Sequence, residues 1–314
     1  MKSASRGVAL ITVLLVVALA ATVCAALVTR QQLSIRTTAN QLHARQAWHY
    51  ARGGEQLALA LLATDLRQSA ARDHRGEAWA QPLPPYPLDG GHLRLSIDDL
   101  SGRFNLNSVV QGGQVDADAM ARLQRLLLLL RLDPQLAWQL VAWIAPPLAP
   151  DLVRQQGERD YLRRQPAYLP ARRPLQEVSE LRLLAGIDEA AYQQLLPHVA
   201  ALPAATPLNL NTADPLVMAS LADGLGLADG RRLVEARGSD GFANVDVLLL
   251  QPLLQRRQVA RSGLAVRSNW FVASSEVAIG DRRLRLLSVL HRDAGQVEVV
   301  ARQLAPPVFP ENDR

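Results

Sequence analysis

The most regular feature of the chain is an uninterrupted apolar run from Val8 to Val28. It contains no charged residue, glycine or proline, and only two threonines and Cys24 interrupt its aliphatic side chains. A helix with a rise of about 1.5 Å per residue makes this run about 31 Å long, which matches the hydrocarbon core of a bilayer. The pattern therefore predicts a single membrane span over residues 8–28.

Two other interpretations of this run are open. A buried helix of a soluble protein usually carries polar residues along one side, and this run does not. A secretory signal peptide also begins with basic residues, here Lys2 and Arg6, and small residues such as Ala20 and Ala21 offer a cleavage position. A retained span is favoured because the run exceeds a usual signal-peptide core and the helical pattern continues beyond Arg30.

The helical pattern extends past the span to about Leu66. This stretch contains no proline, and apolar residues such as Leu42 and Tyr50 recur at roughly helical spacing. Residues 29–66 are therefore predicted to prolong the same helix and to pack its outer half on a globular head. The pair Gly53–Gly54 is a weak point and a candidate kink, since each glycine costs about 1 kcal/mol relative to alanine.

The rest of the chain alternates between strand patterns and helical patterns. After a proline-rich linker, residues 92–108 are predicted to form two strands around a turn. Residues 264–303 predict three antiparallel strands with turns at residues 280–281 and 293–295. Residues 108–263 show no strand pattern and several short helical segments separated by proline or glycine.

These patterns predict an α+β fold. A long N-terminal helix packs on a small antiparallel sheet, and a large all-α domain is inserted between the strands. The expected parts after the helix are a linker with the first strands (67–107), the inserted domain (108–263), the C-terminal strands (264–303) and a tail (304–314).

Composition and charge narrow the classes of function. The chain has 34 Lys+Arg against 29 Asp+Glu, a formal net charge of +5, and all of these cations except Lys2 are arginines spread along the chain. This distribution is weak support for a nucleic-acid partner. The single cysteine, Cys24, excludes an intramolecular disulfide and a cysteine-based zinc site. Metalloprotease, nucleophile-elbow and phosphate-loop motifs are absent from the sequence, so we do not expect an enzyme.

A glycine separates the basic start from the apolar run, as MKSASRG followed by VALITVLLVV. This arrangement resembles the leader of type IV prepilins and pseudopilins, which is cut after the glycine on the cytoplasmic face. The resemblance implies a leader over residues 1–7, cleavage between Gly7 and Val8, and N-methylation of Val8. The usual glutamate at the fifth mature position is replaced by Thr12. Minor pseudopilin K of type II secretion systems characteristically lacks this glutamate, and its architecture resembles the predicted one over essentially the whole chain.

A short internal repeat points to an alternative function. Residues 104–108 (FNLNS) recur as LNLNT at the start of residues 208–250, which resemble a helix-hairpin-helix unit. The resemblance implies such SAM-like units in the inserted domain. In DNA-binding versions, backbone amides at glycines such as Gly224 and Gly226 hold a phosphate, and basic residues, here Arg231–Arg232, add charge. A membrane-tethered nucleic-acid receptor is therefore the alternative, although the sequence offers no aromatic stacking face.

Members of the K class also carry a calcium-binding loop. Its first part, W-I-D-x-D, reads WIAPP over residues 143–147 and lacks both aspartates. Its acidic second part is retained in part as Glu158 and Asp160, on either side of Arg159. Calcium requires several converging oxygen ligands. Two interpretations are open for Glu158 and Asp160, a calcium site and a simple ion pair with the arginine.

The resemblance implies a place at the tip of the periplasmic pseudopilus that drives protein export across the outer membrane. A subunit with Thr12 has no buried carboxylate to pair with a preceding subunit, and the inserted domain would obstruct a subunit above it. The implied partners are the I and J minor pseudopilins, H, the major pseudopilin, prepilin peptidase and the inner-membrane assembly platform, with no nucleic acid. The implied location is the inner membrane, with the head in the periplasm.

Overall fold

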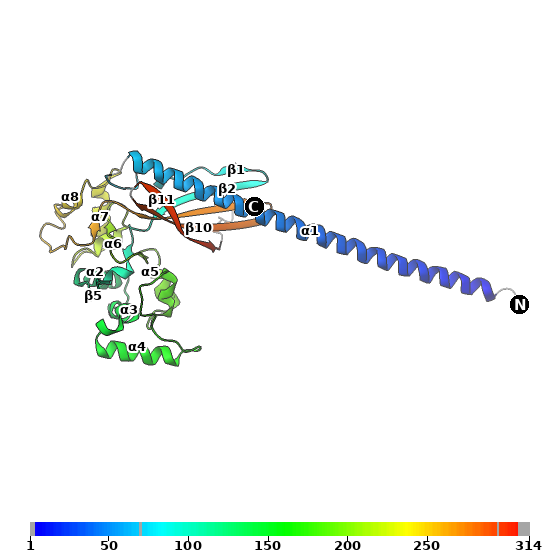
Figure 1. Ribbon diagram of the computed structural model, residues 1–314, viewed down its shortest axis with the longest axis horizontal. Coiled ribbons are helices and arrows are strands. Elements are labelled where there is room, and N and C mark those ends of the chain that lie inside the picture. Colours follow the sequence, from blue (N-terminus) through cyan, green and yellow to red (C-terminus); the bar gives the residue numbers. More distant parts are fainter. Residues whose placement is uncertain (1–3, 69–70, 294, 307–314) are drawn as a thin grey trace.

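The computed structural model describes residues 4–68, 71–293 and 295–306. Residues 1–3 of the predicted leader and residues 307–314 of the predicted tail lie outside this part. Figure 1 shows one long helix that projects far beyond a head built from a sheet and a group of short helices. The fold class is α+β, as predicted.

Helix α1 (Ala4–Gln68) begins just before the apolar run, contains all of it and ends against the sheet. Its apolar N-terminal part is exposed. Nearer its C-terminal end, α1 packs on the sheet and buries Ala47, Ala51, Ala58 and Leu62. Residues at this spacing share one helix face. The three alanines have small side chains, which let the helix lie close to the strands. The predicted extension of the helix into an amphipathic outer half is confirmed.

The glycine pair in α1 does not break the helix. Gly54 faces the sheet, where an added Cβ would lie 2.5 Å from Ser275 Oγ and 3.1 Å from Ser275 Cβ. Gly53 faces open space, with no atom within 4 Å of such a Cβ. Gly54 therefore allows a close approach of helix to sheet, and α1 continues through the glycine pair as one helix.

The sheet of the head has five antiparallel strands in the order β1-β2-β9-β10-β11. Their bounds are β1 (Tyr86–Leu88), β2 (Gly91–Asp99), β9 (Trp270–Ile279), β10 (Arg282–Asp293) and β11 (Gln296–Ala305). The last three form the predicted C-terminal meander. Strand β9 lies between β2 and β10, so a segment near the C-terminus completes a sheet begun before the inserted helices.

The prediction of two paired strands within residues 92–108 is wrong. Strand β2 pairs with β1 and β9, while β3 (Phe104–Asn105) leaves the sheet and pairs in parallel with β6 (Val199–Ala200). The chain turns away after β2, where Asp99 Oδ1 accepts a hydrogen bond from the backbone N–H of Ser101 at 2.7 Å. The alternation of residues 92–99 does mark a strand, but its main partner is the distant strand β9.

The stretch predicted to be free of strands contains several very short ones. A hairpin joins β4 (Val110–Gln111) to β5 (Gln114–Val115), and β7 (Leu208–Asn209) pairs in parallel with β8 (Leu264–Ala265). Each of these strands has two residues, which is too short for an alternating pattern to be recognised in sequence.

Short helices supply most of the regular secondary structure between β2 and β9, and one 3-10 turn precedes β1. The α-helices are α2 (Ala117–Leu129), α3 (Leu136–Ile144), α4 (Asp151–Arg163), α5 (Glu189–Leu195), α6 (Pro215–Ala219), α7 (Leu227–Arg237) and α8 (Val245–Leu249). The 3-10 turns are η1 (Ala78–Ala80), η2 (Leu106–Val109), η3 (Pro146–Leu148) and η4 (Val178–Leu183). One apolar core surrounds α2 and α3, and a second surrounds α6, α7 and α8.

Helix α4 was missed by the sequence analysis. Its composition is polar, but Val153, Gly157 and Tyr161 follow one another at four-residue spacing, and both Gly157 and Tyr161 are buried. That spacing is the signal that would have found it. Residues 178–183 form the 3-10 turn η4.

The repeated Asn-rich motif has one structural role in both copies. Asn105 Oδ1 accepts from the backbone N–H of Asn107 at 3.1 Å, and Asn209 Oδ1 accepts in the same way from Asn211 at 2.9 Å. All four asparagines are buried. After the second copy, Asp214 caps α6 by accepting from two backbone amides, with proline at the next position.

Candidate functional site

The residues predicted for processing lie near the start of α1. Gly7 and Val8 are both part of the helix, which begins at Ala4. From Leu10 to Val28 the large apolar side chains are between 51% and 68% exposed. The helix passes the length and composition criteria for a membrane span, with a mean hydropathy of 2.8 over its most apolar 18 residues and none of that window buried. Cleavage and methylation stay predictions.

The side chain of Thr12 forms its hydrogen bond within its own helix. Thr12 Oγ1 donates to the backbone oxygen of Ala9 at 2.8 Å. Thr22, Thr29 and Thr37 do the same with backbone oxygens three or four residues earlier, at 2.8 to 2.9 Å. The hydroxyl of Thr12 therefore keeps a hydrogen-bond partner even when the helix lies in an apolar environment.

The exposed apolar surface continues beyond the predicted span. Leu33, Ile35 and Leu42 are 59%, 61% and 54% exposed, although they lie outside residues 8–28. Helix α1 first becomes buried at Ala47. An exposed apolar stripe on a long helix is suited to packing against other helices.

The acidic pair proposed for calcium does not converge. Glu158 and Asp160 both lie within α4, two residues apart. At about 100° per residue their side chains leave the helix on roughly opposite sides. Glu158 lies near Arg154, one turn earlier. The preceding WIAPP segment forms the end of α3 and the turn η3 and offers no carboxylate. These residues do not fit the calcium loop of the K class.

The helix-hairpin-helix resemblance corresponds to α6, α7 and the turn between them. Gly224 has a φ of +73°, and an added Cβ at Gly230 would lie 1.9 Å from the backbone oxygen of Pro215. The amide of Gly226 donates to Asp229 Oδ2 at 3.0 Å, so the helix start is occupied by the chain's own carboxylate. The glycines therefore serve the turn and close helix packing, and the geometry does not favour phosphate binding.

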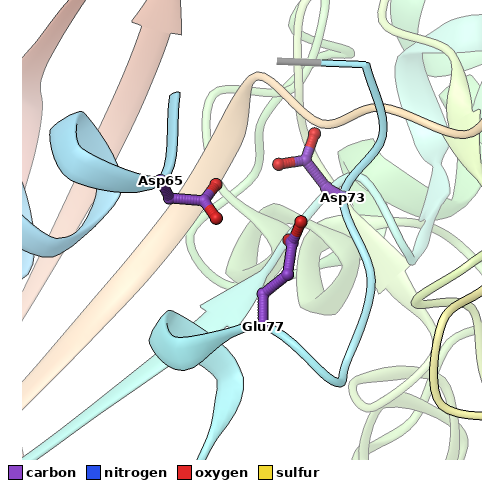
Figure 2. Close-up of side chains that lie close together, drawn as sticks. All are labelled: Asp65, Asp73 and Glu77. Atoms are coloured by element: carbon purple, nitrogen blue, oxygen red, sulfur yellow. The ribbon is translucent and has the colours of Figure 1, made fainter. Parts of the chain in front are cut away.

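A different acidic group lies where α1 meets the connection to the sheet. Asp65 belongs to the last turns of α1, and Asp73 and Glu77 follow in the loop before η1 (Figure 2). Each offers one carboxylate oxygen, and these oxygens lie within 4.8 Å of one another. Within residues 4–68, 71–293 and 295–306, this is the one group of three metal-ligating side chains so close together.

Arg292 of β10 is the cation beside this group. Its Nη1 donates to Asp65 Oδ2 at 2.8 Å, and its Nη2 donates to Asp73 Oδ1 and, at 2.9 Å, to the backbone oxygen of Ser268. Burial raises the pKa of Asp65 to about 6, and the negative charge of Glu77 adds to this rise while Arg292 opposes it. Burial also raises the pKa of Asp73. The single positive charge of Arg292 does not neutralise the three negative charges that Asp65, Asp73 and Glu77 carry when ionised.

The acidic group continues into a buried network that joins the head to the inserted region. Asp99 of β2 accepts hydrogen bonds from Thr212 Oγ1 at 2.5 Å, Asn209 Nδ2 at 3.2 Å and Ser268 Oγ. Burial raises the pKa of Asp99. This site was not predicted from the sequence. Asp99 occupies an inward position in the alternation of β2, where an apolar residue is expected, and that anomaly is the available signal.

Comparisons with known proteins agree with this architecture. Two family models described as type II secretion system (T2SS), protein K match residues 102–204 and 208–267. Type II secretion system protein K of Pseudomonas aeruginosa is 43% identical over 99% of this chain and 96% of its own length. The chain belongs to the type II secretion system protein K family. The protein K of Klebsiella pneumoniae is 36% identical over 96% of this chain and 97% of its own length.

A solved structure extends the similarity to the fold. The crystal structure of the GspK-GspI-GspJ complex from the enterotoxigenic Escherichia coli type 2 secretion system contains a chain that matches this one with a TM-score of 0.74 at 27% identity. The match covers 86% of this chain and 99% of that one. As a member of the protein K family, this chain is a minor pseudopilin and a structural component of the secretion machinery, with one N-terminal helix suited to anchoring it in a membrane.

Proposed function

We propose that this minor pseudopilin initiates and caps the tip of the pseudopilus, with residues 8–28 in the inner membrane and the head in the periplasm. Maturation is proposed to occur by prepilin peptidase between Gly7 and Val8, followed by N-methylation of Val8. The exposed apolar surface of α1 supports this role, since such a helix can pass from the bilayer into a bundle of similar helices.

The observation that carries the tip assignment is the environment of Thr12. A carboxylate at this position would need a cationic partner from the neighbouring subunit once it entered an apolar helix bundle. The hydroxyl of Thr12 instead donates to Ala9 of its own helix at 2.8 Å. A subunit built in this way can occupy the first position, where no earlier subunit supplies a partner.

The position of the inserted region gives independent support. Figure 1 shows the short helices gathered at the end of the head that lies away from the free part of α1. With α1 anchored in the membrane, this end is the distal one. A further subunit stacked beyond it would meet α2 to α8 instead of a flat pilin-like surface, so the same insertion that follows β2 is suited to ending the filament.

The proposed partners follow from the same geometry and from the related complex. That complex contains GspK with GspI and GspJ, and we propose that this chain binds its own I and J minor pseudopilins. Beyond these we propose H, the major pseudopilin and the inner-membrane assembly platform as later contacts. A nucleic-acid partner is not proposed, because the backbone N–H of Gly226 already donates to Asp229 of the same chain.

Labelling of assembled pseudopili tests the tip assignment directly. The head carries an epitope inserted in the exposed turn at residues 112–113, where both glycines face open space, and gold-labelled antibody is imaged on sheared filaments. Label at one end of each filament supports the proposal. Label distributed along the filament would refute it. Normal filament assembly in a strain that lacks this chain would also refute it. A filament carrying the same epitope on the major pseudopilin serves as the control.

A further inference from the structure

The junction between α1, the loop before η1 and β10 holds more negative charge than its neighbours balance. Figure 2 shows the side chains of Asp65, Asp73 and Glu77 converging from two sides. Asp65 and Asp73 share Arg292, whose guanidinium also lies over the ring of Phe271 with 4.8 Å between its central carbon and the ring centroid. Burial of three carboxylates beside one cation is costly unless a further cation or a proton neutralises part of their charge.

Glu77 carries the second, independent observation. Its side chain is buried, with 9% of the residue exposed, and its carboxylate points toward Asp65 and Asp73. Oε2 accepts from Trp79 Nε1 at 2.8 Å and from the backbone N–H of His74 at 3.1 Å. Oε1 accepts no hydrogen bond, and His74 Nε2 lies 3.7 Å away from it. A buried carboxylate oxygen without a donor lacks the interaction that usually offsets its desolvation.

We propose that Asp65, Asp73 and Glu77 bind a calcium ion at this junction. All three ligands are carboxylate oxygens, which hard divalent cations prefer. Calcium binds oxygens at about 2.3–2.6 Å and therefore bridges oxygens up to about 5 Å apart, whereas magnesium, at about 2.1 Å, spans only about 4 Å. The oxygens here lie within 4.8 Å of one another, a spacing that calcium can bridge, and water would take the remaining coordination positions.

The site would act as a clamp between the head and the inserted region. Asp65 fixes the end of α1, and Asp73 is tied to the segment that returns from the insertion, because its backbone N–H donates to Val266 at 2.9 Å and its Oδ2 accepts from Ser268 at 2.7 Å. Calcium at this point links α1 to that returning segment. This inference does not depend on a position at the pseudopilus tip, and it is separate from Glu158 and Asp160 on α4.

Calcium titration of the full chain in detergent tests the proposal. We expect one calcium ion per chain by calorimetry, weaker binding of magnesium, and a rise in melting temperature on adding calcium. Glu77→Gln and Asp65→Asn should each lower calcium affinity at least about tenfold, because each removes a charged ligand. The double variant Glu158→Gln/Asp160→Asn is the matched control and should bind calcium like the wild type.

Terbium luminescence locates the ion without changing a ligand. Trp79 lies next to Glu77 and should sensitise bound terbium, and calcium should displace that signal. Trp79→Phe should lose most of the sensitised signal, while Trp138→Phe, in the core around α3, should keep it. This arm decides the location even if a ligand variant misfolds.

Three outcomes would overturn the proposal. The first is a wild-type chain that binds no calcium at millimolar concentration. The second is calcium binding that is lost in the Glu158→Gln/Asp160→Asn variant and kept in Glu77→Gln. The third is a terbium signal that survives Trp79→Phe. If the wild type binds no calcium and becomes more stable on acidification from pH 7.5 to 5.5, a proton rather than calcium neutralises the group.

Discussion

Arg302 of β11 forms two hydrogen bonds with Glu55 of α1, from Nε to Oε2 at 2.6 Å and from Nη2 to Oε1 at 3.1 Å. Glu55 is completely buried and also accepts from Ser288 Oγ at 2.7 Å, with Arg52 at 3.0 Å on the other side. The last strand of the sheet is thus joined to the first helix through one carboxylate. This pairing ties the buried part of α1 to the edge strand of the sheet.

Replacing Glu55 with glutamine should destabilise the head by about 3 kcal/mol. The amide keeps the shape but loses the charge that both arginines face, and removing one partner of a buried pair costs about 3–5 kcal/mol, less where the remaining partners reach water. Arg302→Ala should cause a smaller loss because its side chain is 37% exposed. Urea unfolding of the full chain in detergent, followed by near-UV circular dichroism, measures both. Equal stability of Glu55→Gln and wild type would contradict this account of the pair.

The same pair predicts a dependence of stability on pH. Burial alone would raise the pKa of Glu55, but hydrogen bonds from Arg302 and Ser288 and the charges of Arg302 and Arg52 outweigh it and hold this pKa below its ordinary value of 4.5. The unfolded chain therefore binds the proton at a higher pH than the folded chain. The stabilisation by Glu55 is complete above about pH 5 and is lost as the pH falls below 4.5.

Comparison with Glu55→Gln isolates this effect. Asp65, Asp73 and Asp99 have raised pKa values, so protonation of these groups makes the fold more stable as the pH falls. Their contribution is common to both proteins and cancels in the difference. The free-energy difference between wild type and Glu55→Gln, measured by urea unfolding from pH 7 to pH 3, should stay constant to about pH 5 and then shrink. A constant difference down to pH 3 would mean that Glu55 does not titrate in this range.

The elements that could be predicted from the sequence are those whose pattern lies within one continuous stretch of the chain. The apolar run, the continuation of α1 and the turn of the meander at residues 280–281 are each encoded by a local pattern of consecutive residues. The pairing of β3 with β6 was not predictable, because the partner lies far along the chain and each strand has two residues. The fold class followed because the long elements dominate it.

The acidic junction could not be predicted for a related reason. Asp65 and Arg292 are neighbours in space, yet they come from the first helix and from β10, near the opposite end of the chain. Asp73 and Glu77 resemble ordinary polar loop residues in sequence. Only the completed sheet buries them, so their altered pKa values are a property of the packing and not of the local pattern.

The two adjacent glycines of α1 should respond in opposite directions to alanine. Gly53→Ala should stabilise the chain by about 0.5–1 kcal/mol, because the position is helical and open. Gly54→Ala should destabilise it by about 1–3 kcal/mol, because the new methyl group meets Ser275 at the helix–sheet contact. Thermal unfolding of both variants in the same detergent provides the comparison, and each variant is the control for the other. A stabilising Gly54→Ala would show that the sheet yields there at no cost.

Processing should depend on Gly7. Gly7→Leu is expected to block removal of the leader and to leave insertion in the membrane intact, because the apolar run from Val8 to Val28 is unchanged. Mass spectrometry of the membrane fraction, with prepilin peptidase co-expressed, should find a methylated Val8 as the first residue of the wild type and an uncut chain in the variant. Ser5→Leu, in the same leader, is the control and should still be cut. A wild-type chain that begins near residue 22 would instead identify a secretory signal peptide.

Position 12 allows a test that separates electrostatics from sterics at the tip. In Thr12→Glu a carboxylate would enter the apolar bundle with no earlier subunit to pair with it. It would either stay charged at a cost of several kcal/mol or take up a proton at neutral pH at a cost of about 3 kcal/mol. We expect initiation, and with it secretion, to fall at least tenfold while the amount of membrane-inserted protein stays normal.

Thr12→Val is the matched control for this experiment. Valine keeps the size of threonine and removes only the hydroxyl, which bonds to Ala9 within the helix and to nothing else in the described structure. Secretion should therefore match the wild type in a strain that carries only the Thr12→Val form. If Thr12→Glu also secretes normally, the charge argument is wrong, and the inserted helices that follow β2 must alone keep other subunits from adding beyond this one. If both variants fail, position 12 matters through the threonine itself, and the absence of a carboxylate is not what places the chain at the tip.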